Sequence, residues 1–275
     1  MSQGDGPSMT HAIGIVGCGA IGRALLRAGD AGELGVAVAG VTSRSAGPAR
    51  EFLETLDSPP PYLELDELVE RSSLLIETAG GHVVPPLADT AFGAGKDLMV
   101  ISIGALLEHP EVIEQARARG CRLYAPSGAI AGLDGIKSAC QGQVDRVEMV
   151  SRKPIAALEG APHLVENEIP VAGLAEAEEV FYGTAREAVR GFPSNLNVSA
   201  AVSLAGIGPD RTMVRIIADP ALSRNCHDIT VEGEFGLLRV HIENIPSENP
   251  KTGRLTALSI IRSVRDVADP VRIGT

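Results

Sequence analysis

A glycine-rich turn near the start of the chain carries the clearest chemical signal. Residues 17–22 read GCGAIG, directly after an apolar run at 11–16 and at the start of a helical pattern. In a dinucleotide-binding turn the first glycine permits the tight turn, the second lets a pyrophosphate approach the backbone, and the third lets helix and strand pack closely. The helix N-terminus then faces the anion. We therefore predict a pyrophosphate site made by Gly17, Gly19, Ala20, Ile21 and Gly22.

The end of the second apolar run bears on which dinucleotide is bound. An acidic residue there usually bonds the ribose 2′-hydroxyl of NAD, but residues 41–45 read VTSRS and contain no acid. Hydroxyl groups together with Arg44 suit a 2′-phosphate instead, which predicts that NADP is used at least as well as NAD. The alternative is that Arg44 is a solvated surface charge, as exposed arginines often are.

Two polar segments farther along the chain could act on a substrate or cofactor. Residues 151–154 read SRKP at the end of a predicted strand. Arg152 and Lys153 could hold a carboxylate there, because Arg offers a planar fork and Lys a point charge; a solvated loop is the alternative. Asn195 and Asn197 stand at a predicted helix start, where asparagine is a good N-cap, although an amide could instead face a nicotinamide carboxamide.

The chain has six histidines, and spacing alone selects none of them as a catalytic group. His82 follows Gly80 and Gly81 after a strand end, where a cofactor edge could lie. His227 stands in the segment NCHD, 225–228, at the start of a predicted strand. An isolated histidine is more often structural than catalytic.

Short apolar runs that alternate with helical patterns must position these residues in the first half. We predict strands at 11–16, 36–41, 74–78, 98–101 and 122–125, and helices at 20–28, 46–56, 85–94 and 109–119. This alternation requires right-handed crossovers and a parallel sheet with both faces covered. The predicted fold class is therefore α/β, with a doubly wound, Rossmann-type parallel sheet.

The pattern changes after residue 124 to longer, partly alternating strands, which fits a second α+β domain whose sheet has one solvated face. These strands are predicted at 144–151, 213–218, 227–233 and 237–245, and helices at 133–140, 184–190 and 251–266. Thr184 and Glu187 form a capping-box pair. We divide the chain into a dinucleotide-binding domain (1–127), a substrate, catalytic and dimerisation domain (128–245), and a C-terminal helix that returns to the first domain (246–275).

Composition excludes several classes of protein. The 275 residues carry 35 acidic and 24 basic side chains, a net charge of -11, which disfavours nucleic-acid binding. The four cysteines lie far apart, so neither a disulfide framework nor a zinc site is expected, and a reduced, cytoplasmic setting is. The start of the chain lacks the pattern of a signal peptide, and no apolar run of about 18 residues predicts a membrane span.

Nine segments resemble the L-aspartate dehydrogenase family, and together they cover nearly the whole chain. They are GIVGCGAIG (14–22), ETAGGHVV (77–84), SIGAL (102–106), APSGAIAGLDGI (125–136), SRKP (151–154), GTAREAVRGFPSNLNVSAAVSLAGIG (183–208), DRTMVRIIADP (210–220), NCHDI (225–229) and ENPKTGRLTALSI (248–260). The segment PSGAIAGLDGI and the asparagine and histidine pair are far more specific than the glycine motif. Family members often have Cys where Thr78 stands, and more often Thr where Ser151 stands; Ser151 keeps the hydroxyl.

The resemblance implies a Rossmann domain followed by a domain like that of dihydrodipicolinate reductase. It also implies oxidative deamination of L-aspartate to oxaloacetate and ammonia with NAD or NADP, through iminoaspartate, which could supply NAD biosynthesis. Carried over by position, His227 is the active-site histidine. The resemblance also implies that Ala131 and Asn197 contact the cofactor. Ala79, after the third predicted strand, is a further expected cofactor-binding residue.

These expectations combine into a mechanism. His227 is expected to remove a proton from the substrate amine, since a histidine with an unperturbed pKa near 6.5 can serve as a base close to neutral pH. Lys153 with Arg152 is expected to hold the carboxylates. Because the amine must be neutral to lose hydride, deamination is expected to be fastest at alkaline pH. No metal is expected, and a homodimer is expected from the prevalence of two-fold assemblies.

Two other functions remain open from the sequence. One is a reductase of the dihydrodipicolinate-reductase type acting on a cyclic imine, although the paired histidines followed by lysine of such reductases are not found. The other is a non-catalytic Rossmann module that senses nucleotides.

Overall fold

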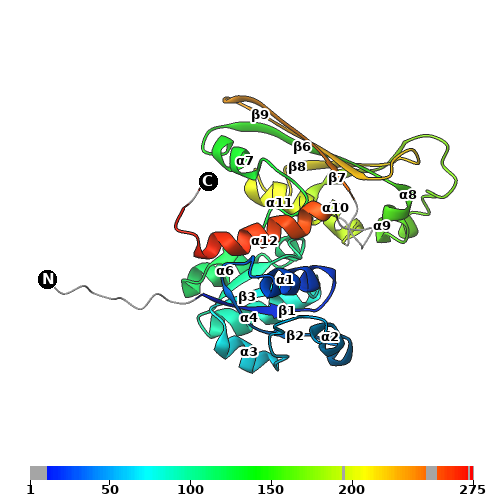
Figure 1. The fold of residues 1–275 in the computed structure, drawn as a ribbon. Coiled ribbons are helices and arrows are strands. Elements are labelled where there is room, and N and C mark those ends of the chain that lie inside the picture. Colours follow the sequence, from blue (N-terminus) through cyan, green and yellow to red (C-terminus); the bar gives the residue numbers. More distant parts are fainter. Residues whose placement is uncertain (1–10, 194–195, 246–252, 272, 275) are drawn as a thin grey trace.

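Two five-stranded sheets, one from each half of the chain, organise the fold (Figure 1). The computed structural model describes residues 11–193, 196–245, 253–271 and 273–274. Sheet A belongs to the first half and sheet B to the second, and helices pack between and around them. No helix in the described part of the chain is both long enough and apolar enough to cross a membrane.

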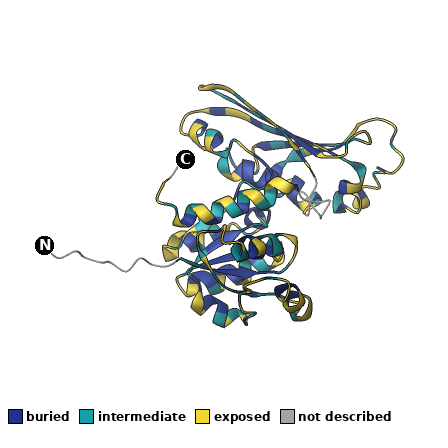
Figure 2. Ribbon diagram, viewed as in Figure 1, coloured by how far each residue is buried: buried dark blue, intermediate teal, exposed yellow. Residues whose placement is uncertain are grey.

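Sheet A has the strand order β2-β1-β3-β4-β5, and all neighbouring strands are parallel. Its strands are β1 (Ala12–Val16), β2 (Ala37–Thr42), β3 (Leu74–Glu77), β4 (Asp97–Val100) and β5 (Leu123–Tyr124). The central strands β1, β3 and β4 are mostly buried, while the surrounding helices expose their outer sides (Figure 2), because a doubly wound sheet is covered on both faces. The predicted α/β, Rossmann-type fold class is confirmed.

The helices of the first half follow the predicted alternation, with two additions. They are α1 (Ala20–Asp30), α2 (Ala46–Leu53), α3 (Leu65–Arg71), α4 (Val84–Gly93), α5 (Ala105–Glu108) and α6 (Glu111–Arg119), with a short 3-10 turn η1 (Gly81–Val83). α3 and α5 were not predicted from the sequence, and the predicted α2 ended three residues later, at 56. The strand order reverses between β1 and β3, so the carboxyl ends of these strands flank the crevice where open α/β sheets bind ligands.

Sheet B has the order β10-β9-β6-β8-β7. Its strands are β6 (Val144–Lys153), β7 (Glu178–Thr184), β8 (Thr212–Ala218), β9 (Asn225–Gly233) and β10 (Gly236–Asn244). β6 and β8 are parallel, and the other neighbours are antiparallel. β7 was not predicted from the sequence, and the predicted β6 ended at Ser151, two residues before the observed end.

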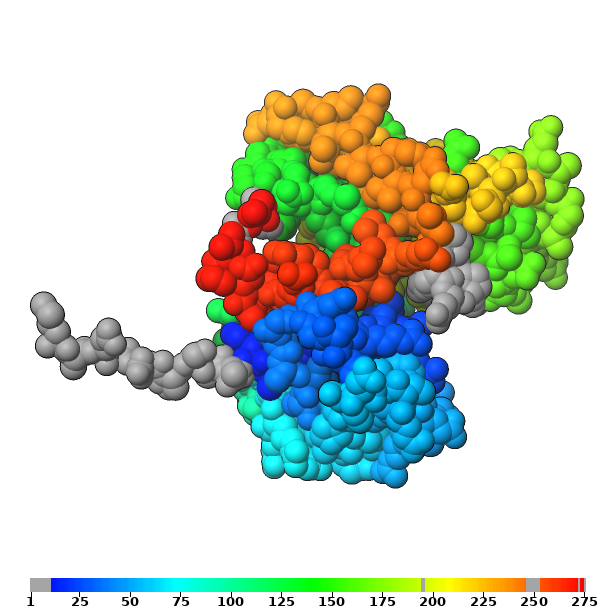
Figure 3. Space-filling view, in the orientation of Figure 1, coloured from blue at the N-terminus to red at the C-terminus, as the bar shows by residue number. Residues whose placement is uncertain are grey.

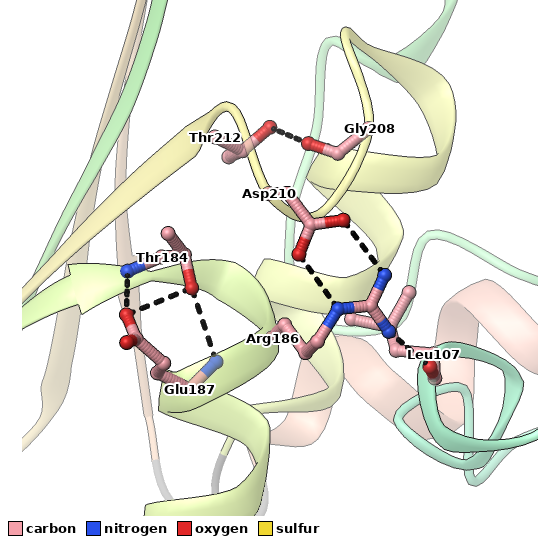
Figure 4. Close-up of polar contacts among 7 residues, drawn as sticks. All are labelled: Leu107, Thr184, Arg186, Glu187, Gly208, Asp210 and Thr212. Carbon is pink, nitrogen blue, oxygen red and sulfur yellow. Dashed lines mark hydrogen bonds and ion pairs between the residues drawn. The ribbon is translucent and has the colours of Figure 1, made fainter.

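Helices of the second half cover one face of sheet B (Figure 1). They are α7 (Leu133–Ala139), α10 (Ala185–Gly191) and α11 (Asn197–Ala205), with the short α8 (Ile155–Leu158) and α9 (Pro162–Glu166) beside them. The predicted capping box at the start of α10 is present: the Thr184 hydroxyl accepts from the Glu187 amide, and the Glu187 carboxylate accepts from the Thr184 amide (Figure 4).

Arg186 on α10 forms a hydrogen bond that connects the two halves (Figure 4). Its guanidinium forms a bidentate ion pair with Asp210, at 2.6 and 2.9 Å, and donates to the Leu107 carbonyl of α5 at 2.6 Å. The ion pair raises the pKa of Arg186 and lowers that of Asp210. Because Leu107 belongs to the first half, the contact holds the helices of sheet B against the dinucleotide-type half.

The last helix, α12 (Arg254–Ala268), lies across the junction between the halves (Figure 3). Its residues Ile260, Val264 and Val267 are buried in the core that contains Ile13 and Ile15 of β1. The predicted helix began at 251, and residues 251–252 lie outside the described part of the chain.

Candidate active site

Each glycine of the turn after β1 is favoured at its position for a different physical reason. Gly17 has a φ of +112°, and a Cβ there would lie 2.8 Å from the Thr78 backbone. A Cβ on Gly22 would lie 2.1 Å from the Gly17 carbonyl oxygen. A Cβ on Gly19 would meet nothing within 4 Å, so the backbone there faces open space. The N-cap of α1 is Gly19 and has no side-chain capping bond, which leaves the helix start free to receive an anion.

A buried carboxylate ties together the loops that follow β3 and β4. Glu77 is fully buried, and its carboxylate accepts hydrogen bonds from the amides of Ala79 and Gly80 at 2.8 and 2.7 Å. It also accepts from the amides of Ile101 and Ser102 at 3.2 and 2.9 Å, and from the Ser102 hydroxyl at 3.1 Å. No role was predicted for Glu77 from the sequence. The signal that could have identified it is an acidic residue at the end of the apolar run LLIE.

A cleft that is partly open to solvent lies between the two halves. The first half and α12 contribute apolar lining from Ile21, Ile101, Ile103 and Ile260. The second half contributes polar lining from Lys153, Asn197, Asn225, His227 and Asn244. Three predicted site residues of distant sequence position, Lys153, Asn197 and His227, therefore meet in one cleft beside Ile21 of the glycine turn.

His227 lies on β9 opposite Ser151 of β6. The imidazole is only 2% exposed, and its Nδ1 lies 2.9 Å from the Ser151 hydroxyl oxygen. Burial, together with the nearby charge of Lys153, lowers the pKa of His227 to about 3. This pKa lies well below the unperturbed value near 6.5, so the ring is neutral throughout the physiological range.

Lys153 lies two residues after Ser151 on the same face of β6, as the two-residue repeat of a strand requires. It is 2% exposed, and desolvation lowers its pKa from 10.5 to about 8. Among the described residues, no acceptor forms a hydrogen bond or ion pair with its ammonium group. Arg152 is exposed on the opposite face, so the expected pairing of Arg152 with Lys153 on a carboxylate is wrong.

The three asparagines of the cleft differ in how their amides are used. The Asn197 side-chain oxygen accepts from the Gly104 amide at 3.0 Å, which joins α11 to the loop after β4. Asn197 is not an N-cap, since α11 begins at this residue and its N-cap is Leu196; Asn195 lies outside the described residues. The Asn244 amide donates to the Ala129 carbonyl at 2.7 Å. The Asn225 oxygen has no hydrogen-bond partner in the described structure.

The remaining sequence candidates do not line the cleft. Arg44, Ala79 and Ala131 are exposed. Arg44 follows the carboxyl end of β2, Ala79 follows that of β3, and Ala131 is two residues beyond Ala129, which does line the cleft. His82 is exposed in η1 and also lies outside the lining. No role was predicted for Asn225 or Asn244 from the sequence. For Asn225, the signal that could have identified it is the polar residue at the start of the segment NCHD.

Comparisons with known proteins agree with this two-part organisation. Residues 134–267 match the family model described as aspartate dehydrogenase, C-terminal, and residues 17–126 match the one described as homoserine dehydrogenase, NAD binding domain. The solved structure of aspartate dehydrogenase from Thermotoga maritima superposes with a TM-score of 0.75 at 23% identity, covering 96% of this chain and 99% of that chain. This likeness establishes a shared fold.

Sequence relatives extend the match over nearly the full length. L-aspartate dehydrogenase 3 of Bordetella bronchiseptica is 43% identical over 264 residues, 96% of this chain and 97% of that protein. L-aspartate dehydrogenase of Methanosarcina mazei is 44% identical over 268 residues, 96% of this chain and 99% of that protein. The resemblance found in the sequence is thereby confirmed, and the chain belongs to the L-aspartate dehydrogenase family, whose members are oxidoreductases.

Proposed function

We propose that the protein oxidatively deaminates L-aspartate: L-aspartate, water and NAD(P)⁺ become oxaloacetate, ammonium, NAD(P)H and a proton. One observation carries the proposal. A buried lysine with no counter-ion among the described residues and a neutral histidine share a cleft that begins at the glycine turn. The relatives named as L-aspartate dehydrogenases point to the same substrate.

The first half fits a nicotinamide dinucleotide. Open space at Gly19 and the uncapped start of α1 suit a pyrophosphate, and Ile21, Ile101 and Ile103 offer an apolar wall to the flat ring. When bound, the nicotinamide supplies the acceptor for the hydride that leaves the substrate Cα.

Further cofactor contacts are proposed at four residues. Arg44 and Ala79 follow the carboxyl ends of β2 and β3, where such sheets bind ligands, and the amide nitrogen of Asn197 is available beside the cleft. Ala131 follows the lining segment 126–129. Arg44 with its hydroxyl neighbours suits the 2′-phosphate of NADP.

Lys153 holds one substrate carboxylate. A desolvated ammonium without a counter-ion is unfavourable, and a carboxylate would supply the missing charge with a charge-assisted hydrogen bond. The same contact keeps Lys153 protonated at a pH where the free protein loses that proton, because an opposite charge favours the charged form.

His227 accepts a proton from the substrate amine. With the Ser151 hydroxyl accepting from Nδ1–H, Nε2 carries the lone pair that faces the substrate. A carboxylate on Lys153 offsets the positive charge that lowers the pKa of His227, so substrate binding raises that pKa toward the useful range. The imine formed by hydride loss is then hydrolysed, and the same imidazole can activate the water.

The test is a direct assay with both cofactors. L-aspartate with NAD⁺ or NADP⁺ should give reduced nicotinamide together with equal amounts of oxaloacetate and ammonia, and succinate, which has no amine, should give none. We expect kcat to increase above pH 7 as the amine deprotonates, and kcat/KM with NADP to equal or exceed that with NAD. Absence of turnover with either cofactor would refute the proposal, as would a kcat that falls steadily above pH 7. A hundredfold preference for NAD would refute the role of Arg44.

A further inference from the structure

The side-chain oxygen of Asn225, a residue that lines the cleft, is a buried acceptor without a partner among the described residues. Asn225 is 5% exposed and begins β9. Its Oδ1 is one of two buried side-chain polar atoms of the described residues that lack a hydrogen bond, and the other, on Gln115, lies outside the cleft lining. Buried polar groups are nearly always paired in folded proteins, so an unpaired acceptor in a cleft indicates that a ligand supplies the donor.

Strand register places this oxygen among the reacting groups. Asn225 and His227 alternate onto the same face of β9, as do Ser151 and Lys153 on β6. Ser151 pairs with His227, and one position beyond the last paired residues of the two strands Lys153 comes opposite Asn225. The four side chains form a compact group on one face of sheet B.

Among the groups of L-aspartate, the amine alone can complete this oxygen's bonding. Both carboxylates are acceptors, and they match the ammonium of Lys153. The amine is a donor whether protonated or neutral. An amide oxygen has negligible basicity, so it can hold an N–H without removing the proton and leaves that transfer to His227.

We propose that Asn225 Oδ1 accepts a hydrogen bond from the substrate α-amine, orients it toward His227, and makes the site selective for amino dicarboxylates over dicarboxylates that lack a nitrogen. This inference rests on the proposed function. It gives the second half a specificity residue separate from the carboxylate anchor, Lys153.

The test pairs a change in the protein with a change in the ligand. Asn225→Leu removes the acceptor at similar size, and succinate is L-aspartate without the amine. Dissociation constants of both ligands are measured on the complex with NAD(P)H, where neither reacts. We expect the variant to bind L-aspartate about 10- to 100-fold more weakly, the range for a hydrogen bond to a charged group, and succinate within about twofold of the wild type.

Three further measurements complete the design. The dissociation constant of NAD(P)H should be unchanged, Asn225→Thr should recover part of the preference for L-aspartate because it keeps an oxygen, and the ligand-free Leu variant should unfold at the same temperature or higher. Equal weakening of both ligands, unchanged binding of L-aspartate, or weakened cofactor binding alone would overturn the inference; the last would indicate that the oxygen meets the nicotinamide carboxamide. Wild-type turnover of L-aspartate tests the proposed function separately.

Discussion

Glu77 in the first half and Lys153 in the second half are both buried ionisable residues, and their surroundings are opposite. Glu77 accepts five hydrogen bonds, four from backbone amides and one from a hydroxyl. Lys153 has no hydrogen bond or ion pair to any residue that the structure describes, and its opposite neighbour Asn225 has an unpaired oxygen. The first half thus pairs the buried carboxylate of Glu77 internally, whereas in the second half the Lys153 ammonium and the Asn225 oxygen have no partner among the described residues.

This difference separates groups that hold the fold from groups that await a ligand. Internal bonds to Glu77 fix the loops after β3 and β4 before any ligand arrives. Unpaired groups around Lys153 decrease the stability of the free protein, and a bound dicarboxylate amino acid would supply their partners. Active sites commonly trade stability for function in this way.

Replacing His227 should give the largest effect, and it should separate catalysis in the second half from cofactor binding in the first half. His227→Ala is expected to lower kcat for L-aspartate by about 10² to 10⁴, the usual contribution of general acid–base catalysis, while the dissociation constant of NAD(P)H stays within about twofold. Steady-state kinetics and cofactor titration by fluorescence give the two numbers. An unchanged kcat would remove His227 from the mechanism.

The next largest effect is on the free energy of unfolding, and it comes from replacing Glu77 in the first half. Glu77→Gln keeps the shape but places an amide NH₂ toward backbone N–H donors, so at least one buried donor loses its acceptor. We expect the free energy of unfolding to fall by about 3 kcal/mol, and cofactor binding to weaken because the 78–80 and 101–102 loops loosen. Urea unfolding measures the first change. A variant as stable as the wild type would show that the hydrogen bonds to Glu77 contribute little.

Lys153→Met should instead increase the free energy of unfolding, and the size of this increase should depend on pH. In the folded protein the pKa is lowered from 10.5 to about 8, so between these values the unfolded chain binds more protons and wild-type stability increases with pH. Below pH 8 both states are protonated and the full penalty, about 3 kcal/mol, is present. Replacing the ammonium by an uncharged thioether removes that penalty, so the variant should be more stable at pH 7 and the difference should shrink toward pH 10.5.

Comparison with the wild type at each pH cancels the titration of other groups. Urea-unfolding free energies at pH 7, 8, 9 and 10.5 are sufficient. A constant difference across this range, or a variant that is less stable at pH 7, would contradict the assignment of Lys153 as a buried cation without a partner among the described residues.

The sequence predicted the first half better than the second, for a physical reason. Parallel strands buried on both faces are continuous apolar runs, so their positions and the glycine turn could be predicted locally. β7 was missed because it begins with Glu178 and Glu179 and ends near Gly183, which leaves a short apolar signal.

The chemistry of the site depends on pairing between distant residues. Ending the predicted strand at Ser151 left Arg152 and Lys153 in a loop, where both could face a substrate. The observed strand continues to Lys153, and its alternation turns Lys153 inward and Arg152 outward. That Ser151 lies opposite His227, 76 residues away, follows from sheet register, which no local pattern specifies.

Ser151 gives the smallest expected effect, because it supports His227 without touching the substrate. Ser151→Ala removes the partner of Nδ1, so the ring loses its fixed tautomer and orientation, and kcat should fall about tenfold, the value of one hydrogen bond. Ser151→Thr keeps the hydroxyl and should restore most of kcat. If Ser151 acted through packing alone, the Thr variant would not be expected to have a higher kcat than the Ala variant. Equal kcat in the Ala and wild-type proteins would show that burial alone, without the hydroxyl, holds the imidazole in place.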